Sequence, residues 1–514
     1  MKILTLSEKG KQIAEAKKRK KAKSPSQEEL SRLLEHYQTG QYDDAEKLAV
    51  YITQEFPYHQ FGWKVLGAIL GQTSRISEAV NANQKSVELA PQDALAHYNL
   101  GITLQELGRF DEAEASYTQA IAFKPDYALA HNDLGITLQE LGRLAEAEAS
   151  YTQAIAFKPD YAKAHNNLGI TLQELGRFDE AEASYTKAIA LKPGFAPAHN
   201  NLGITLQELG RLAEAEASYT KAIAFKPDYA KAHYNLGVTL KDLGRLAEAE
   251  ASYTKAIAFK PDDAEAHSGL GVVLHMNGDI DSGLESLEKA NNIDPDLHNN
   301  HIILEILKAR KALGIIEFSA DNISNLGYSS EQFSQPVILN RAIEAGLISS
   351  LYKMKSIELT KFNNSSISDP RFGNGKCSRD FKLFKDDSPI IKSVAEDLTI
   401  IMREVVKSDI CISESFFNIF GAGGGSTPHK HSGKLDADEY LNFGKQKYSL
   451  VYYLSVGDQN CMDPGILKLY DPSEDILPYE GMIAIFPADR KHSSIYGGKK
   501  DRVMIGVNFY SLTC

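Results

Sequence analysis

The 514-residue sequence predicts a multidomain protein in which an all-α solenoid is followed by an α+β domain. Two series of residues spaced 34 apart run through the first half, with glycines from Gly67 onward and prolines from Pro57 onward. After about residue 315 this period is lost, and short runs rich in β-branched and aromatic residues follow. A fixed period is typical of stacked helical repeats, whereas short strands between tight turns are typical of a sandwich or barrel.

Each repeat is expected to form a pair of helices. Apolar residues recur at helical spacing between residues 100 and 121, and Gly108 divides them into two runs. Pro125 ends the second run, because proline cannot donate into a continuing helical ladder. Gly101 and Ala113 are small where the two helices need to approach closely. One such pair cannot bury its apolar face alone, so neighbouring pairs are expected to stack.

The period and its small-residue and proline pattern resemble the tetratricopeptide repeat (TPR) family. This resemblance implies a TPR superhelical solenoid of eight units over residues 26–296. A basic arm over residues 1–25 precedes it, and a capping helix and linker over residues 297–320 follow. The first and last units depart most from the pattern, as expected of end caps.

Polar residues recur in one register on the first helix of the repeats. These residues are Asn99, Asp133, Asn167, Asn201 and Asn235. The series resembles the asparagine ladder in the TPR superhelix of O-GlcNAc transferases, which clamps extended peptide backbones. Side-chain amides suit that task, because each offers a donor and an acceptor to a peptide bond. We therefore expect the concave face to bind a protein or peptide; the alternative is a solvated polar face that keeps near-identical repeats soluble.

The second half carries helical patterns first and strand-like runs after them. Helices are predicted over residues 339–354 and 388–406. Strands are predicted over residues 413–420, 448–456, 465–471, 481–487 and 502–510. The predicted architecture is a β-rich core with flanking helices.

Histidines stand at the ends of two predicted strands. His429 and His431 lie in PHKHSG, and His492 follows 63 residues after His429 in FPADRKHSS. Arg502 comes ten residues after His492. This order resembles the double-stranded β-helix (jelly roll) of Fe(II)/2-oxoglutarate oxygenases, and the segments PGILKLYDP and ILPYEGMIAIFPADRKH resemble the prolyl-hydroxylase-like branch. The resemblance covers roughly residues 370–512 and implies an oxygenase-like jelly-roll domain over residues 321–514.

The resemblance also implies a ligand set and cofactors. The metal would be Fe(II), held by His429, His431 and His492, with 2-oxoglutarate as co-substrate and ascorbate as an auxiliary reductant. Such centres use three protein ligands on one face of the iron. Arg502 suits the far carboxylate of 2-oxoglutarate, because a guanidinium binds a carboxylate through two parallel hydrogen bonds. The structural alternative for Arg502 is an ordinary pair with a nearby acid such as Asp501.

Two further residues are candidates for binding the co-substrate. Tyr453 and Asn418 lie in predicted strands and could add hydrogen bonds to 2-oxoglutarate.

The third ligand departs from the oxygenase pattern, which is His-x-Asp or His-x-Glu. One alternative keeps His429 and His492 and takes a carboxylate from Asp436 or Asp438. Another is the cupin pattern, which would bind metal through His429, His431, Asp436 and His492. A third is a different or inactive metal centre. Arg502 favours the oxygenase, because a cupin gives no reason for a cation at that position.

Composition limits the remaining classes of function. The net charge of −12 argues against nucleic acid as a partner. The sequence offers no signal peptide and no apolar run long enough for a membrane, and four scattered cysteines do not form a disulfide scaffold. A reducing cytoplasm is therefore the expected compartment, and long runs of near-identical TPRs on an oxygenase-like domain look bacterial. The sequence does not define the oligomeric state.

These observations lead to one functional expectation and one alternative. We expect a cytoplasmic oxygenase, a hydroxylase acting on a protein or peptide that the TPR solenoid recruits. The alternative is a TPR protein-binding scaffold whose β domain is a cupin-like metal site or is inactive.

Overall fold

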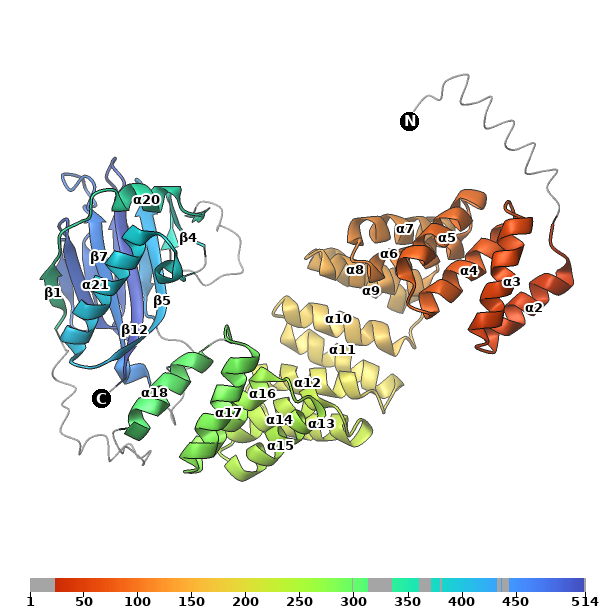
Figure 1. The fold of residues 1–514 in the computed structure, drawn as a ribbon, viewed down its shortest axis with the longest axis horizontal. Helices are drawn as coiled ribbons and strands as arrows, with labels where there is room; N and C mark the ends of the chain where they lie inside the picture. Colours follow the sequence, from red (N-terminus) through yellow and green to blue (C-terminus); the bar gives the residue numbers. More distant parts are fainter. Residues whose placement is uncertain are drawn as a thin grey trace, which may run out of the picture. The chain divides into compact units, whose positions relative to one another are not determined.

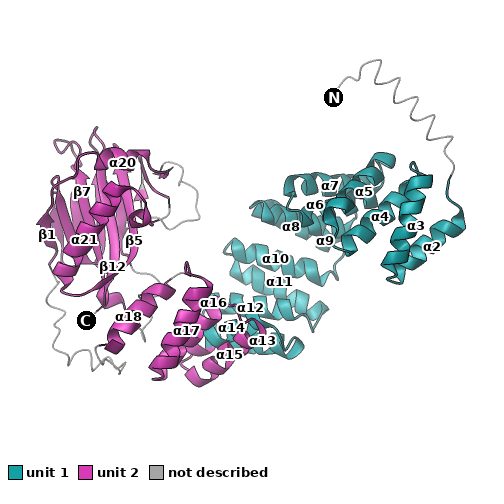
Figure 2. Cartoon of the chain, in the orientation of Figure 1, with its two compact units in different colours: residues 1–239 teal, residues 240–514 magenta. Residues whose placement is uncertain are grey.

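The computed structural model divides the chain into two compact units, residues 1–239 and residues 240–514 (Figure 2). The residues that it describes are 24–297, 299–312, 335–359, 371–379, 381–431, 436 and 443–512. Nearly all of the basic arm and most of the linker predicted after residue 297 lie outside these residues. Each unit is described by itself.

Consecutive antiparallel helix pairs make up the described part of the first unit (Figure 1). Its helices are α2 (Gln27–Gln38), α3 (Tyr42–Glu55), α4 (Gln60–Gln72), α5 (Ile76–Leu89), α6 (Ala94–Glu106), α7 (Phe110–Phe123), α8 (Ala128–Glu140), α9 (Leu144–Phe157), α10 (Ala162–Glu174), α11 (Phe178–Leu191), α12 (Ala196–Glu208) and α13 (Leu212–Phe225). Helix α14 (Ala230–Asp242) crosses the division between the units. The second unit continues the series with α15 (Leu246–Phe259), α16 (Ala264–Met276), α17 (Ile280–Ile293) and α18 (Asn300–Ala312).

The glycine between the helices of a pair has the conformation that the sequence pattern requires. Gly108 has a φ of 70°, a left-handed conformation that favours glycine. Its N–H donates to the carbonyl of Gln105 (2.9 Å), and the N–H of Arg109 donates to that of Leu104 (2.9 Å). These two bonds form a Schellman motif, which satisfies the last carbonyls of α6 and turns the chain into α7.

The small residue predicted at the crossing of each pair packs against a tyrosine. A Cβ added to Gly101 would lie 2.6 Å from the ring of Tyr117, which is fully buried. The Tyr117 hydroxyl donates to Gln105 Oε1 at 2.8 Å. Glycine therefore leaves space for a buried aromatic ring whose one polar atom is satisfied.

The C-terminal part of the second unit is rich in antiparallel strands. Its strands are β1 (Val337–Asn340), β2 (Ser356–Glu358), β3 (Arg371–Phe372), β4 (Gly375–Ser378), β5 (Ile410–Phe420), β6 (Gly424–His429), β7 (Lys447–Ser455), β8 (Leu467–Leu469), β9 (Glu474–Ile476), β10 (Met482–Pro487), β11 (His492–Tyr496) and β12 (Arg502–Ser511). One described sheet has the order β1-β10-β7-β12-β5-β4-β2, and the other has the order β3-β6-β11-β8-β9. The prediction of a helical solenoid followed by a strand-rich region is confirmed.

Alternating side chains of the large sheet enter two different cores. Ile483 and Ile485 of β10 pack with α20 (Leu347–Lys353) and α21 (Pro389–Val406) on one face. Met482, Ala484 and Phe486 pack on the other face with residues of the small sheet. The period of two along each strand thus separates a helix-covered face from an inter-sheet core. The histidines and Arg502 belong to the inter-sheet side.

The helix predicted over residues 339–354 is wrong at its beginning. Helix α20 covers only Leu347–Lys353, and Val337–Asn340 form β1, which pairs with β10. Gly346 stands just before α20 with a φ of 91°, so the chain turns there rather than continuing a helix. Pairing with β10 supplies hydrogen-bond partners for the backbone of Leu339 and Asn340, which the sequence pattern had assigned to the helix.

The last repeat and α18 share a hydrophobic cluster with the strand-rich part. Leu287 of α17 and Ile306 and Leu307 of α18 belong to the same buried cluster as Phe443 and Tyr510. This common core explains why the compact second unit begins at residue 240 rather than at the sequence boundary near residue 320.

We predict that Gly169→Val destabilises the solenoid by about 2 kcal/mol, because added side-chain atoms would enter the space of the buried Tyr185 ring. A Cβ at Gly169 would lie 2.6 Å from that ring. Urea unfolding followed by circular dichroism measures the change. Lys187→Val is the matched control, since Lys187 is exposed on the second helix of the same pair. Equal losses for both variants would mean that the close approach is unimportant.

Candidate functional site

The strand positions of the histidines follow from the pairing of β6 with β11. His429 lies directly opposite His492. Strand β6 has a bulge between Ser426 and His429, because the pair next to His429–His492 is Ser426–Ser494. Such a bulge changes the direction in which the neighbouring side chains point. A Cβ added to Gly425 would lie 2.3 Å from the carbonyl oxygen of Ser494. The glycine run before PHKHSG therefore lets the two strands lie close together beside the histidines.

The structure brings the three candidate histidines into one group. One ligand nitrogen from each of His429, His431 and His492 lies within 4.8 Å of the others. Nδ1 of His429 is 2.8 Å from the carbonyl oxygen of Thr427, and Nδ1 of His492 is 3.2 Å from that of Arg490. In the tautomer that donates from Nδ1, Nε2 keeps the lone pair that a metal binds.

The surroundings of His431 and His492 favour the neutral form of both imidazoles. Burial lowers the pKa of His492 to about 3, with a further lowering by His429 and an opposing hydrogen bond to the Arg490 carbonyl. Burial also holds the pKa of His431 well below its usual range, and His492 and His429 add to the effect. A neutral imidazole is the form that binds a metal, so no proton has to leave these rings at neutral pH.

Asp436, the alternative metal ligand, is not part of the histidine group. Its carboxylate accepts a hydrogen bond from the Tyr510 hydroxyl (2.5 Å) and pairs with Lys447 Nζ (2.9 Å). The Asp436 side chain is only 2% exposed, so this pair lies inside the protein. Asp438 lies outside the described residues. Among the described residues, the geometry favours three histidines over the sets that include Asp436.

Arg502 is fully buried at the start of β12, between the two sheets. Its Nη1 donates to the Gly465 carbonyl and to the Ser494 hydroxyl (3.3 Å), and its Nη2 donates to the Pro464 carbonyl (3.0 Å). Its Nε is buried without a hydrogen-bond partner. The guanidinium thus keeps hydrogen-bonding capacity on its Nε side.

No carboxylate among the described residues forms an ion pair with Arg502. Asp501 instead accepts a hydrogen bond from the hydroxyl of Tyr352. The rings of Tyr453 and Tyr496 lie 5.4 and 5.2 Å from the guanidinium carbon. Burial lowers the pKa of Arg502, and the two tyrosines oppose that change. A buried cation without a counter-charge is costly, so this position favours an anionic ligand.

The two secondary candidates lie in different places. Tyr453 packs beside Arg502, and burial raises the pKa of its phenol to about 12. Asn418 lies on β5, where its Oδ1 accepts a hydrogen bond from Nη1 of Arg371 (3.3 Å). Both face Met504 of β12 in register, on opposite sides of that strand. The structure therefore brings Tyr453 to Arg502 and Asn418 to a different arginine.

Arg371 is a further candidate site residue, and it was not among those predicted from the sequence. Its guanidinium carbon lies 4.9 Å from the ring of Phe381 and 6.0 Å from that of Phe416. Its charge also contributes to the lowered pKa of His431. Residue 371 starts a two-residue strand, and a shift of one residue would turn it to the other face, so no sequence pattern could place it.

The recurring asparagines of the repeats form a ladder of side-chain hydrogen bonds within the first unit. Nδ2 of each donates to an asparagine Oδ1 in the preceding repeat: Asn167 to Asn132 (3.1 Å), Asn201 to Asn166 (3.2 Å) and Asn235 to Asn200 (3.0 Å). Asn99 takes no part in these bonds among the described residues. An amide has two N–H donors, so each donating asparagine keeps one N–H for a ligand. Their role in binding a peptide stays a prediction.

Asp133 occupies the ladder position with a carboxylate in place of an amide. It accepts hydrogen bonds from the Tyr98 hydroxyl (2.7 Å) and from Asn132 Nδ2 (2.8 Å). Burial raises the pKa of Asp133 above its ordinary value, despite these two bonds and the charge of Lys163. The ionised form is therefore disfavoured at this position.

Comparison with known proteins identifies the repeats. Tetratricopeptide repeat family models match residues 64–128, 98–162, 162–195, 184–217, 206–244 and 239–278. The chain contains tetratricopeptide repeats. The repeat period had predicted this family, and the prediction is confirmed.

Three solved structures illustrate the similarity. The Cut9–Hcn1 hetero-tetramer of the APC/C shares 17% identity over 54% of this chain and 55% of that chain, with a TM-score of 0.42. YrrB, a TPR protein with an unusual peptide-binding site, shares 24% identity over 35% of this chain and 93% of its own (TM-score 0.31). PilW, a widely conserved type IV pilus biogenesis factor, shares 27% over 41% and 96% (TM-score 0.38). This chain thus spans just over half of the first of these proteins. No curated protein matches the sequence.

Within the described residues, every helix is too short or too polar to cross a membrane.

We predict that His431→Ala weakens Co(II) binding by at least about tenfold, whereas Asp436→Asn leaves it unchanged. The first change removes one of the three ligand nitrogens. The second changes a side chain outside the histidine group and keeps an oxygen that can accept the Tyr510 hydrogen bond. Calorimetric titration of the full chain with Co(II) measures both affinities. A loss with Asp436→Asn as large as that with His431→Ala would place the carboxylate on the metal.

We predict that Asp133→Asn raises the thermal unfolding midpoint of the solenoid at pH 7. The raised pKa means that ionising Asp133 costs stability as the pH rises through it. The gain should therefore fade as the pH falls and Asp133 takes up its proton. Asp160→Asn is the control, because Asp160 is exposed. A lower midpoint for Asp133→Asn at pH 7 would contradict the prediction.

Proposed function

We propose that the strand-rich domain is an Fe(II)/2-oxoglutarate-dependent oxygenase, a hydroxylase whose substrate is a protein or peptide recruited by the TPR solenoid. One observation carries this proposal. Three imidazoles that could hold a metal converge on the inter-sheet side of β11, and the same strand contacts a buried arginine that has no acidic partner among the described residues.

The histidine group fits a metal by its donor chemistry. His429 and His492 are held by paired strands, and their Nδ1 atoms are engaged by backbone carbonyls. Rigid elements and such outer hydrogen bonds are the support that a metal centre needs. His431 comes from the loop after β6, and its backbone N–H donates to the carbonyl of Ala488 at 2.9 Å.

The arginine fits a carboxylate of the co-substrate. The Ser494 hydroxyl, which accepts from Arg502, stands two residues after His492 on β11, roughly 7 Å along the strand. The Nε atom of Arg502 lacks a partner, and a carboxylate would supply one. These features support 2-oxoglutarate binding between the histidines and Arg502, with Tyr453 packed on the guanidinium.

In such a reaction, Fe(II) and 2-oxoglutarate supply the oxidising chemistry: one atom of O2 enters the substrate C–H bond and the other enters succinate, with release of CO2. The residues of this chain would bind and orient. The three histidines hold the metal, and Arg502 fixes the co-substrate. Phe486 packs edge-on against His492 at 5.0 Å, which keeps water from one side of that ring.

A cupin-like metal centre without oxygenase activity is the second candidate. The observation that favours it is that the described group lacks the carboxylate of the His-x-Asp or His-x-Glu oxygenase pattern; Asp436, the carboxylate of the cupin pattern, lies outside the group as well. In that case the TPR scaffold would be the main functional part.

We predict that the full chain, titrated with Fe(II) and then with 2-oxoglutarate without oxygen, develops the weak visible charge-transfer band of a chelated 2-oxo acid. Arg502→Lys should keep Fe(II) binding and weaken 2-oxoglutarate binding by at least about tenfold, because lysine cannot offer the two parallel N–H bonds. Absorption spectroscopy measures both steps.

Arg341→Lys is the matched control. Arg341 is a part-buried arginine of the same unit, but it pairs with Glu344 and Asp397 on the helix-covered side of the large sheet. Iron binding without the band would favour the cupin-like centre. Absence of iron binding in the folded parent chain would reject both metal proposals.

A further inference from the structure

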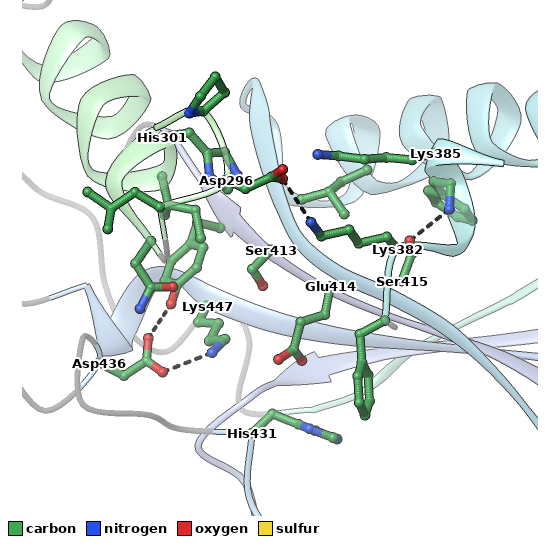
Figure 3. Close-up of a pocket in the computed structure, with 18 of the residues that line it drawn as sticks. Asp296, His301, Lys382, Lys385, Ser413, Glu414, Ser415, His431, Asp436 and Lys447 are labelled. Atoms are coloured by element: carbon green, nitrogen blue, oxygen red, sulfur yellow. Dashed lines mark hydrogen bonds and ion pairs between the residues drawn. The ribbon is translucent and has the colours of Figure 1, made fainter. Parts of the chain in front are cut away.

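A cavity of about 590 Å³, open to solvent and lined in part by exposed side chains, lies on the second unit beside His431. One side is formed by the connection between α17 and α18, including Asp296, together with His301 of α18, and another by residues 412–415 of β5. His431 lines the same cavity, and Figure 3 shows it on the side opposite Asp296 and His301. The candidate metal centre therefore opens into a space that the end of the repeat array helps to enclose.

The wall from the repeats is firmly attached to the strand-rich part. Arg310 of α18 donates to Gln446 Oε1 (3.4 Å), and its guanidinium carbon lies 5.0 Å from the ring of Phe443. Asp296 pairs with Lys382 at 2.9 Å, close to the cavity. Together with the shared hydrophobic cluster, these contacts make the cavity a part of the folded unit.

Among the described residues that line the cavity, lysines outnumber acids. Lys382 is paired with Asp296, and Lys447 with Asp436. Lys385 and Lys430 also line the cavity, and neither forms an ion pair with a described residue. The remaining acid of the lining, Glu414, accepts a hydrogen bond from the neutral Asn508 amide (2.5 Å) and keeps its charge, so four lysines face three carboxylates.

The two unpaired lysines lie on different segments. Lys385 ends η3 (Leu383–Lys385), next to the ion pair of Asp296. Its charge helps to hold the pKa of Asp296 below the ordinary value, after the larger effect of Lys382. Lys430 stands between two of the candidate ligands, His429 and His431. An anionic group in the cavity would meet cations from both sides.

We propose that this cavity is the substrate chamber and that it takes a peptide segment carrying an acidic side chain. The volume suits a few residues of peptide, and the excess of lysines suits a carboxylate near the metal centre. The last TPR unit and α18 then build part of the chamber as well as ending the solenoid. The inference rests on the proposed function, since it names the substrate class of that reaction.

The test is fluorescence anisotropy of a labelled octapeptide of alternating glycine and glutamate, with the full chain and without metal. The parent should bind it, and the Gly–Gln peptide should bind more weakly. Lys385→Ala with Lys430→Ala should weaken binding of the glutamate peptide by about fivefold. Lys468→Ala is the matched control, because Lys468 is an exposed lysine on β8 that does not line the cavity.

A second measurement locates the peptide. A benzophenone on the glutamate peptide should label residues 295–302 and residues 412–415, as identified by mass spectrometry. Labelling confined to residues 24–239, equal binding of the glutamate and glutamine peptides, equal binding by the two lysine variants, or no binding to the parent would each overturn the proposal. Since no iron is present, these outcomes do not depend on whether the oxygenase proposal succeeds.

Discussion

The pairing of β6 with β11 is the constraint on which the candidate site depends. It sets His429 opposite His492, and the bulge beside them changes the direction of the chain before it reaches His431. The same strand, β11, supplies Ser494 to Arg502. One antiparallel register thus fixes the distance between the histidine group and the buried cation, and the glycines of β6 allow that register.

The buried charges of this unit are of two kinds, one paired within the protein and one without a described counter-charge. Lys447 and Asp436 neutralise each other and tie the described part of the loop after His431 to Tyr510. Within the described part of the chain, the hydrogen-bond partners of Arg502 are neutral oxygen atoms. A paired charge holds its own surroundings in place, whereas a buried cation with spare donors is stabilised by an anion that arrives from outside.

The sequence predicted much of the fold because the information was periodic. The same residue pattern recurs in each 34-residue unit. It therefore predicts the helix pairs, the turn at Gly108 and the close crossing at Gly101. The histidine triplet was visible because its members flank strands. Asn418, Arg371 and the cavity lysines were not predictable in this way, because their positions depend on which strands are neighbours. The beginning of the helix predicted from residue 339 failed for a similar reason, since pairing with β10 decides the state of that segment.

The asparagine ladder bears on how the number of repeats can change during evolution. Asn167, Asn201 and Asn235 each donate to the same kind of atom on the unit before, so the surface that one repeat offers matches the surface that the next one needs. Duplicating a unit between Asn132 and Asn235 would repeat the same asparagine-to-asparagine bond at the new junction. The length of the solenoid can therefore increase by duplication of a repeat, without a new set of contacts between neighbouring repeats.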